Sequence, residues 1–168
     1  MKRQKYPASV IKTGASLYKV VPWYDDEDDK YSVDLEVWVV RSIRRKAGQV
    51  SRFGKAKHGK GTDLNQRVNI TRKMEGVTWT KGEWEKSIPD WLRKQFTVGD
   101  DLPEGYYTTA QAAFRYAKDE LEENIKRGEK ELADGKPNGM WASDLEHDRR
   151  LLSLVKGRIT KEKNKAKK

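Results

Sequence analysis

The chain has no cysteine among its 168 residues. Disulfide bonds, thiol catalysis and cysteine-ligated zinc are therefore excluded. The lack of cysteine fits a reducing compartment, and we expect a cytoplasmic protein. The sequence also lacks an apolar run near the ~20 residues that a membrane helix needs. Its charged N-terminus is not followed by the apolar segment of a secretory signal. We therefore expect no membrane partner.

Motifs of the common enzyme classes are absent as well. The sequence contains no P-loop, no nucleophile elbow and no dinucleotide fingerprint. Its two histidines, His58 and His147, lie far apart along the chain. We expect no enzyme and no cofactor. One alternative left open is a metal-independent nuclease that uses His58 with neighbouring lysines. Catalysis needs groups that are held in place, and a glycine-rich stretch offers little support for them.

Two acidic groupings are weak candidates for a cation site. Asp144, His147 and Asp148 would share one helical face, and one histidine with two carboxylates can hold a metal. Acidic residues in a first helical turn also stabilise the helix dipole without a ligand, so we predict no metal site. The acidic run at residues 25–29 is consecutive and lacks the spacing of a calcium loop. It reads as a solvated turn, or as a competitor that shields nearby basic residues.

Acidic residues are missing from one long stretch, residues 37–62, which carries eight Lys or Arg residues and four glycines. Lysine and arginine bind phosphates and release counterions. Glycines allow such a segment to order on contact, and an aromatic ring can stack on a base. The alternative is a solvated loop that binds nothing. The predicted contact residues are Arg41, Arg44, Arg45, Lys46, Arg52, Phe53, Lys55, Lys57, His58 and Lys60.

The whole chain has a net charge of +10. A charge of this sign favours nucleic acid, an anionic surface or an acidic protein as partner. Six Trp, seven Tyr and three Phe also supply large apolar surfaces that disordered chains lack. We therefore expect a folded, aromatic core with charged extensions.

Alternating apolar residues predict strands over residues 15–22, 31–43 and 66–73, with a further short segment at 77–80. Pro22 is expected to end the first strand. The second and third strands are expected to pair antiparallel, which makes residues 44–65 an unusually long hairpin connection. Connections of that length are usually functional or disordered.

The second half of the sequence predicts helices. Pro89 favours a short helix over residues 90–96, with Trp91, Leu92 and Phe96 toward the core. Capping boxes that begin at Thr108 and Ser143 introduce two amphipathic stretches. Gly135 and Pro137 should end the first of them. Two helices joined by a short link predict an antiparallel αα-hairpin that covers one face of the sheet, or else projects toward a partner.

These elements predict an α+β fold: an antiparallel twisted β-sheet, a short Trp-rich helix and a C-terminal antiparallel αα-hairpin. The expected division is a basic tail at 1–9, a β-rich part at 10–105 with the basic loop at 41–62, the hairpin at 106–159, and a lysine-rich disordered tail at 160–168. A small cysteine-free chain of this design with dense charge resembles many small accessory proteins of bacteriophages.

The predicted function is non-enzymatic binding of DNA or RNA with little sequence specificity. The alternative is a protein-interaction module or inhibitor, for example a phage accessory protein, that binds an acidic or nucleic-acid-binding surface of a partner protein. The sequence leaves the oligomeric state open.

Overall fold

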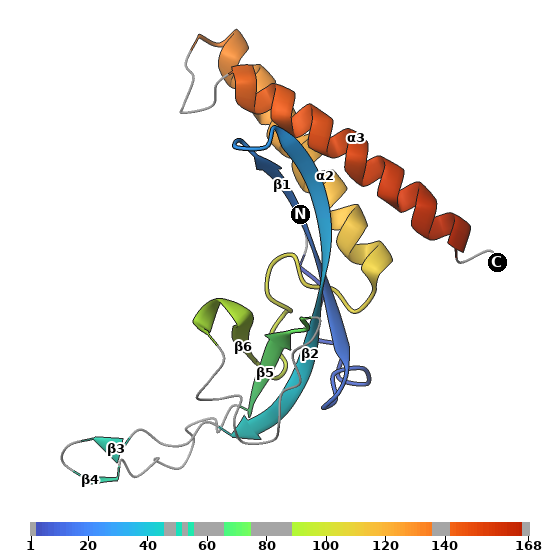
Figure 1. The fold of residues 1–168 in the computed structure, drawn as a ribbon. Helices are drawn as coiled ribbons and strands as arrows, with labels where there is room; N and C mark the ends of the chain where they lie inside the picture. Colours follow the sequence, from blue (N-terminus) through green and yellow to red (C-terminus); the bar gives the residue numbers. More distant parts are fainter. Residues whose placement is uncertain are drawn as a thin grey trace. The chain divides into compact units, whose positions relative to one another are not determined.

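The computed structural model describes residues 3–45, 50–51, 54–55, 66–74, 89–135 and 142–165. These residues form a four-stranded sheet of order β1-β2-β5-β6, a separate pair of two-residue strands and two long helices (Figure 1). The predicted α+β class, an antiparallel sheet followed by helices, is confirmed. Along the chain the elements are β1 (Ser16–Asp25), β2 (Lys30–Arg45), β3 (Val50–Ser51), β4 (Gly54–Lys55), β5 (Gln66–Arg72), the 3-10 helix η1 (Asp90–Leu92), β6 (Arg93–Thr97), α2 (Ala110–Ala133) and α3 (Ala142–Lys165).

The antiparallel pairing of β2 with β5 is confirmed, and the pairing ends with Arg45 opposite Gln66. Residues 46–65, here called the basic connection, therefore join two paired strands. Within it, β3 and β4 form a short antiparallel pair in which Ser51 lies opposite Gly54. The connection thus includes a small hairpin that the sequence did not suggest.

The first strand was predicted to stop at Pro22, and this prediction is wrong because β1 runs on to Asp25. The order of the sheet explains the difference, since β1 is an edge strand. Proline is tolerated in an edge strand where its nitrogen faces away from the neighbouring strand, because the ladder then keeps all of its hydrogen bonds.

The helix predicted over residues 90–96 is also wrong. Only η1 is helical, and the chain then forms β6, which pairs with β5 so that Phe96 lies opposite Val68. Leu92 and Phe96 are buried as expected, whereas the Trp91 side chain is 65% exposed. The segment predicted at 77–80 lies outside the described residues.

The chain divides into two compact units. Unit 1 comprises Met1–Arg3, Leu17–Val37 and Glu104–Lys168. Unit 2 comprises Gln4–Ser16 and Trp38–Pro103. The long strand β2 contributes to both units, so no linker marks the boundary.

Both predicted tails are partly structured. In unit 2 the amide of Leu102 donates to the carbonyl of Gln4, and the ring of Tyr6 packs 6.3 Å from that of Phe96. Residues 4 and 6 are therefore attached to unit 2. The predicted disorder of residues 160–165 is wrong, because α3 continues to Lys165. Neither described helix is long and apolar enough to cross a membrane.

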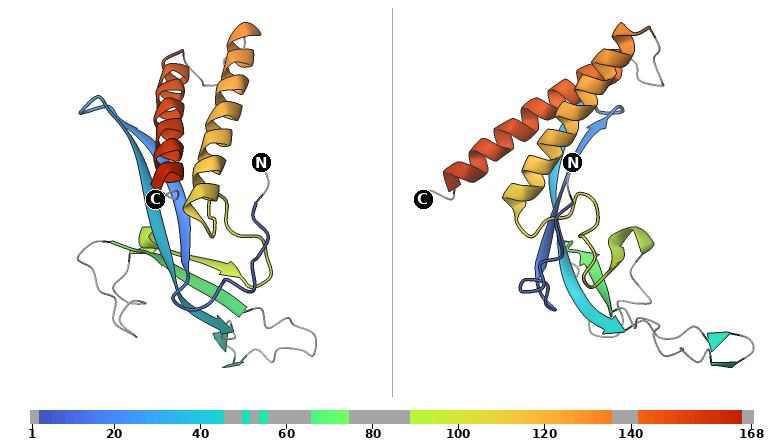
Figure 2. Two further views of the ribbon diagram at one scale, coloured as in Figure 1. Left: turned by 90° about the vertical axis from the view of Figure 1, so that its right-hand side faces the viewer. Right: turned by 180° about the vertical axis from the view of Figure 1, so that it is seen from behind.

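In unit 1 the helices pack on the β1–β2 hairpin. Val20 of β1 and Val33 of β2 share one buried cluster with Phe114, Leu121 and Val155 from the helices. α2 and α3 lie side by side (Figure 2). Ion pairs from Glu122 to Lys156 and from Glu129 to Arg149 show that the helices are antiparallel. The αα-hairpin therefore covers the strands of its own unit and does not project as a free arm.

The helix ends differ slightly from the predicted caps. Thr109, not Thr108, is the N-cap of α2, and its hydroxyl accepts from the amide of Ala112 at 3.2 Å. Ser143 lies inside α3, which begins at Ala142, so the second capping box is wrong. Gly135 follows α2 with a φ of 64°, a left-handed conformation that favours glycine and ends a helix as predicted.

Candidate nucleic-acid interface

The net charge of the chain belongs to unit 2. Counted on the sequence, unit 2 has 17 Lys and Arg residues and 7 Asp and Glu residues, which gives +10. Unit 1 has 19 of each and is neutral overall. A polyanion is attracted to the part of a protein that carries the excess positive charge. The search for an interface therefore falls on unit 2, where the sheet is formed by β2, β5 and β6.

One face of this sheet is apolar. Residues directly opposite each other in adjacent strands lie on the same face. Val68 lies opposite both Ile43 and Phe96, and Ile70 lies opposite Val40. All of these except the half-buried Ile43 are buried. This face makes the core of unit 2 and explains the alternation seen in the sequence of β5.

The opposite face is polar and carries four arginines. Two hydrogen bonds run across it: Arg41 Nε donates to Thr71 Oγ1 at 2.7 Å, and Asn69 Nδ2 donates to Ser42 Oγ at 2.9 Å. No residue that the register places on this face is acidic. We call it the arginine face, and it comprises Val39, Arg41, Ser42, Arg44, Arg67, Asn69, Thr71, Arg93, Gln95 and Thr97, of which Asn69 and Thr71 are buried.

Arg41 occupies a bulge in β2, because the register with β5 shifts between Val40 and Ser42. Its hydrogen bond to the fully buried Thr71 holds the guanidinium near the sheet. Burial lowers the pKa of Arg41. One of the five guanidinium N–H donors is used in this bond, so the side chain is positioned by the sheet while its role in phosphate contact stays a prediction.

Arg44 and Arg67 lie directly opposite each other where β2 and β5 enter the basic connection. Arg44 is exposed and Arg67 is half-buried. The register thus brings two guanidinium side chains to one part of the arginine face, beside the start of the basic connection.

The other predicted contact residues follow Arg44 along the chain. Arg45 ends β2 and Lys55 lies in β4, and for these two only the backbone is described. Lys46, Arg52, Phe53, Lys57, His58 and Lys60 lie outside the described residues. The described structure thus brings Arg41 and Arg44 to one sheet face and leaves the other predicted contacts as predictions.

Three residues of interest were missed by the sequence reasoning. Arg67 and Arg93 reach the arginine face from β5 and β6. The alternation in β5 could have revealed Arg67, since it alternates with the buried Val68 and Ile70. Arg93 could not be found, because its strand was taken for a helix. Trp91 was assigned to the core, the usual place of a tryptophan.

His147, considered above as part of a candidate metal site, contacts two tyrosine side chains. The Nδ1 atom of His147 lies 2.6 Å from the Tyr31 hydroxyl, and its ring stacks on Tyr24 at 4.2 Å. The Tyr24 hydroxyl donates to Asp29 at 3.1 Å. Within the described residues no group of three His, Cys, Asp or Glu side chains could hold a metal ion. The histidine thus joins α3 to the β1–β2 hairpin.

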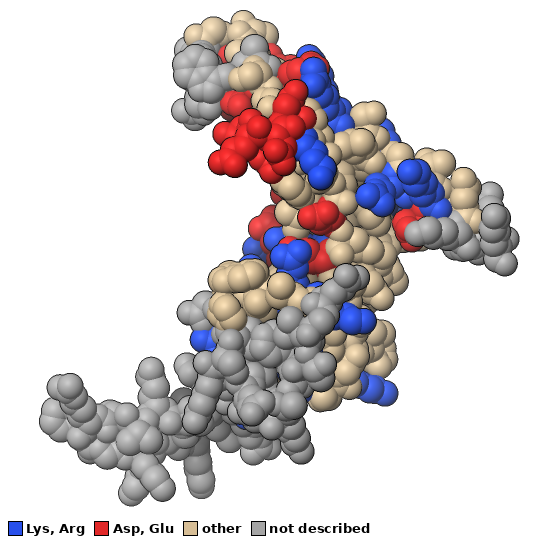
Figure 3. Space-filling model, viewed as in Figure 1, with Lys and Arg blue, Asp and Glu red and all other residues tan. Residues whose placement is uncertain are grey.

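The acidic run at residues 25–29 lies at the turn between β1 and β2. Figure 3 shows Asp and Glu side chains gathered there, beside Lys and Arg side chains. The contacts described for the run, such as Asp29 with Tyr24, lie within unit 1. Whether it competes for the basic stretch stays a prediction.

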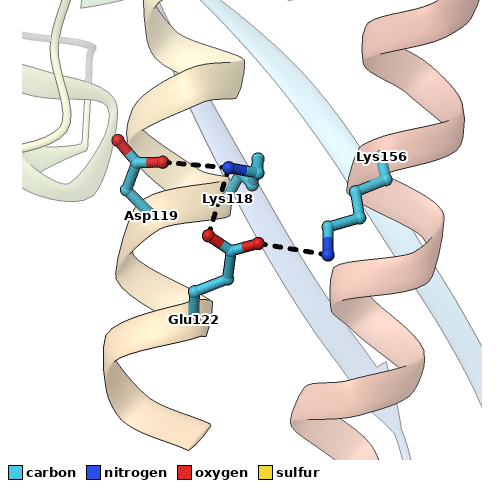
Figure 4. A network of polar contacts seen from close by, with 4 residues as sticks. All are labelled: Lys118, Asp119, Glu122 and Lys156. Carbon is cyan, nitrogen blue, oxygen red and sulfur yellow. Dashed lines mark hydrogen bonds and ion pairs between the residues drawn. The ribbon is translucent and has the colours of Figure 1, made fainter. Parts of the chain in front are cut away.

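A groove of about 470 Å³ lies between α2 and α3 in unit 1. Its cations are partly neutralised, because Glu122 contacts both Lys118 and Lys156 at 3.1 Å, and Lys118 also contacts Asp119 (Figure 4). The hydrogen bonds from these lysines lower the pKa of Glu122. The lining residues are Arg115, Lys118, Asp119, Lys156, Ile159, Thr160 and Lys163.

Comparison of the chain with protein-family models, curated proteins and solved structures found no match.

Proposed function

We propose that this is a non-enzymatic nucleic-acid-binding protein that contacts phosphates through the arginine face and the basic connection. The observation that supports this most directly is the location of the whole +10 charge in unit 2. Four arginines share one acid-free sheet face in that unit, and the basic connection begins at its end. A phosphate chain would meet both features together.

The chemistry of these side chains suits phosphate more than base edges. Guanidinium groups form paired, charge-assisted hydrogen bonds with phosphate oxygens. Contacts to phosphate position a protein on nucleic acid without carrying sequence information. We therefore propose binding with little sequence specificity, without a cofactor, in the reducing cytoplasm that a cysteine-free chain fits.

Binding of the purified protein to labelled single-stranded DNA, duplex DNA and RNA tests the proposal. Fluorescence anisotropy should show binding at about 50 mM salt that weakens steeply toward about 200 mM. Polyglutamate is the matched control, because it offers negative charge without phosphates. The proposal fails if no nucleic acid binds at low salt, or if polyglutamate binds equally well.

A second candidate function is binding of an acidic segment of a partner protein. The observation that favours it is the groove between α2 and α3, which combines basic residues with the apolar side chain of Ile159. In that case an accessory or inhibitory role would rest on unit 1. A stoichiometric partner that survives nuclease treatment and no longer binds the Arg115→Glu, Lys163→Glu double variant would support it. Disappearance of every co-purifying protein after nuclease would exclude it.

A further inference from the structure

Trp91 is the most exposed large apolar side chain of the described residues, with 65% of its surface accessible. It lies in the short helix η1, and its successor Leu92 is only 4% exposed. Leu92 and Phe96 thus anchor this segment in the core of unit 2, and the indole of Trp91 is left outside. Tryptophan is enriched at interfaces, where it offers a large apolar ring to a partner.

The sequence neighbours of Trp91 are basic. Arg93 and Lys94 open β6, the edge strand of the sheet, and Arg93 belongs to the arginine face. Asp90 is the one acidic residue directly beside it in the sequence. If the arginine face binds phosphates as proposed, an exposed indole near it supplies the second element of a single-strand site. Such sites combine a basic surface along the backbone with an aromatic ring for the bases.

We infer that Trp91 is a base-stacking platform and that the preferred ligand of this surface is single-stranded nucleic acid. The inference rests on the proposed function and adds the class of ligand. In a duplex each base is already stacked between its neighbours, so an indole at the surface gains little. An unpaired base can place its ring against the indole, and any of the bases can do so.

A protein anchor is the competing explanation, since tryptophan is enriched among the residues that dominate protein interfaces. Such anchors sit in patches depleted of charge. Trp91 instead adjoins two basic residues in the unit that carries the whole net charge. These surroundings favour nucleic acid.

The inference is tested with the full chain and three variants: Trp91→Ala, Trp91→Phe and Leu154→Ala. Affinity is measured for a thymidine oligonucleotide and for a duplex with the same number of phosphates, at one salt concentration. Trp91→Ala should lose about 5- to 150-fold in single-strand affinity and almost nothing on the duplex. Trp91→Phe should keep most of the single-strand affinity, because a phenyl ring also stacks.

Leu154→Ala is the control, because Leu154 is a 42% exposed apolar residue in the neutral unit 1. It should bind like the unchanged protein. Circular dichroism confirms that each variant folds, and binding should quench tryptophan fluorescence less in Trp91→Phe than in the unchanged chain.

Equal single-strand affinity in Trp91→Ala and the unchanged protein would overturn the inference, as would an equal decrease on both ligands. In either case salt-dependent binding by the unchanged protein would leave the proposed function intact. If the unchanged protein binds neither ligand, the proposed function itself fails.

Discussion

Arg44 of β2 lies directly opposite Arg67 of β5, in the last rows of the ladder before the basic connection. Side chains opposite each other on one face are about 4.5–5.5 Å apart at Cβ. The two arginines therefore start from neighbouring points on one face of the sheet. We propose that both contact phosphates of the same nucleic-acid strand.

Replacing Arg44 and Arg67 with glutamine should weaken nucleic-acid binding. Each substitution should lower the slope of log affinity against log salt by about 0.7–0.9. Salt-dependent anisotropy measures the slope, and urea denaturation confirms that the variant is folded.

The matched control is the double variant Lys126→Gln, Arg127→Gln on α2. It removes the same charge from exposed positions of the neutral unit 1. Its salt slope should stay close to that of the unchanged protein. An equal decrease in both double variants would mean that net charge alone, and not the arginine face, determines binding.

The buried cluster of unit 1 predicts a contrast between two leucines of the helical hairpin. Leu121 is 6% exposed and belongs to the cluster, whereas Leu154 is 42% exposed. Leu121→Ala should cost about 2–5 kcal/mol of unfolding free energy, and Leu154→Ala about 0.5 kcal/mol or less. Similar losses of unfolding free energy in the two variants, measured by denaturation, would contradict the burial of Leu121 and the exposure of Leu154.

Two glycines predict opposite responses to alanine. Gly157 lies inside α3, and an added Cβ there meets nothing within 4 Å, so Gly157→Ala should stabilise by about 0.5–1 kcal/mol. Gly135 has a φ of 64° after α2, and Gly135→Ala should destabilise by about 1–2 kcal/mol. Thermal unfolding of both variants checks the signs, and a stabilising Gly135→Ala would contradict the left-handed helix end.

Two glutamates of α2 predict opposite pH dependence. Burial, with a smaller effect of Glu104, raises the pKa of Glu120 above its ordinary 4.5. The folded state then holds this proton to higher pH than the unfolded state. Stability therefore falls as pH rises from about 4.5 through the raised value. Glu120→Gln should stabilise near neutral pH and make no difference well below pH 4.5.

Glu122 behaves in the opposite way, because Lys156 and then Lys118 lower its pKa below 4.5. Its contribution to stability is complete above the unfolded pKa and disappears as pH falls through the lowered value. Glu122→Gln should therefore destabilise near neutral pH and have no effect in strong acid. Melting temperatures of both variants are measured near neutral pH and in acid. If both substitutions changed the melting temperature near neutral pH in the same direction, these assignments would be refuted.

Local patterns were sufficient to predict much of the fold. Alternating residues predicted β2 and β5 within a few positions, and an amphipathic stretch between Thr108 and Gly135 predicted α2. The basic stretch at residues 37–62 was likewise visible, because it contains no acidic residue. These features depend on neighbours in the sequence, which a single chain displays directly.

The features that were missed depend on partners distant in the sequence. β6 forms because β5 offers an unpaired edge, and residues 93–97 have no strand pattern strong enough to show this alone. Pro22 is tolerated because β1 is itself at an edge. The exposure of Trp91 accompanies the burial of Leu92 in η1 and of Phe96 in β6, a strand that was not foreseen.

The central claim is that phosphate contacts by unit 2 hold the ligand, and the salt dependence of binding tests it most directly. The measurement compares the unchanged protein with a variant in which Lys46, Arg52, Lys55 and Lys57 of the basic connection are glutamine. We predict a steep slope for the unchanged protein, reduced in the variant by about 0.7–0.9 for each phosphate that is no longer neutralised. An unchanged slope in the variant, or no binding by the unchanged protein at low salt, would contradict the account.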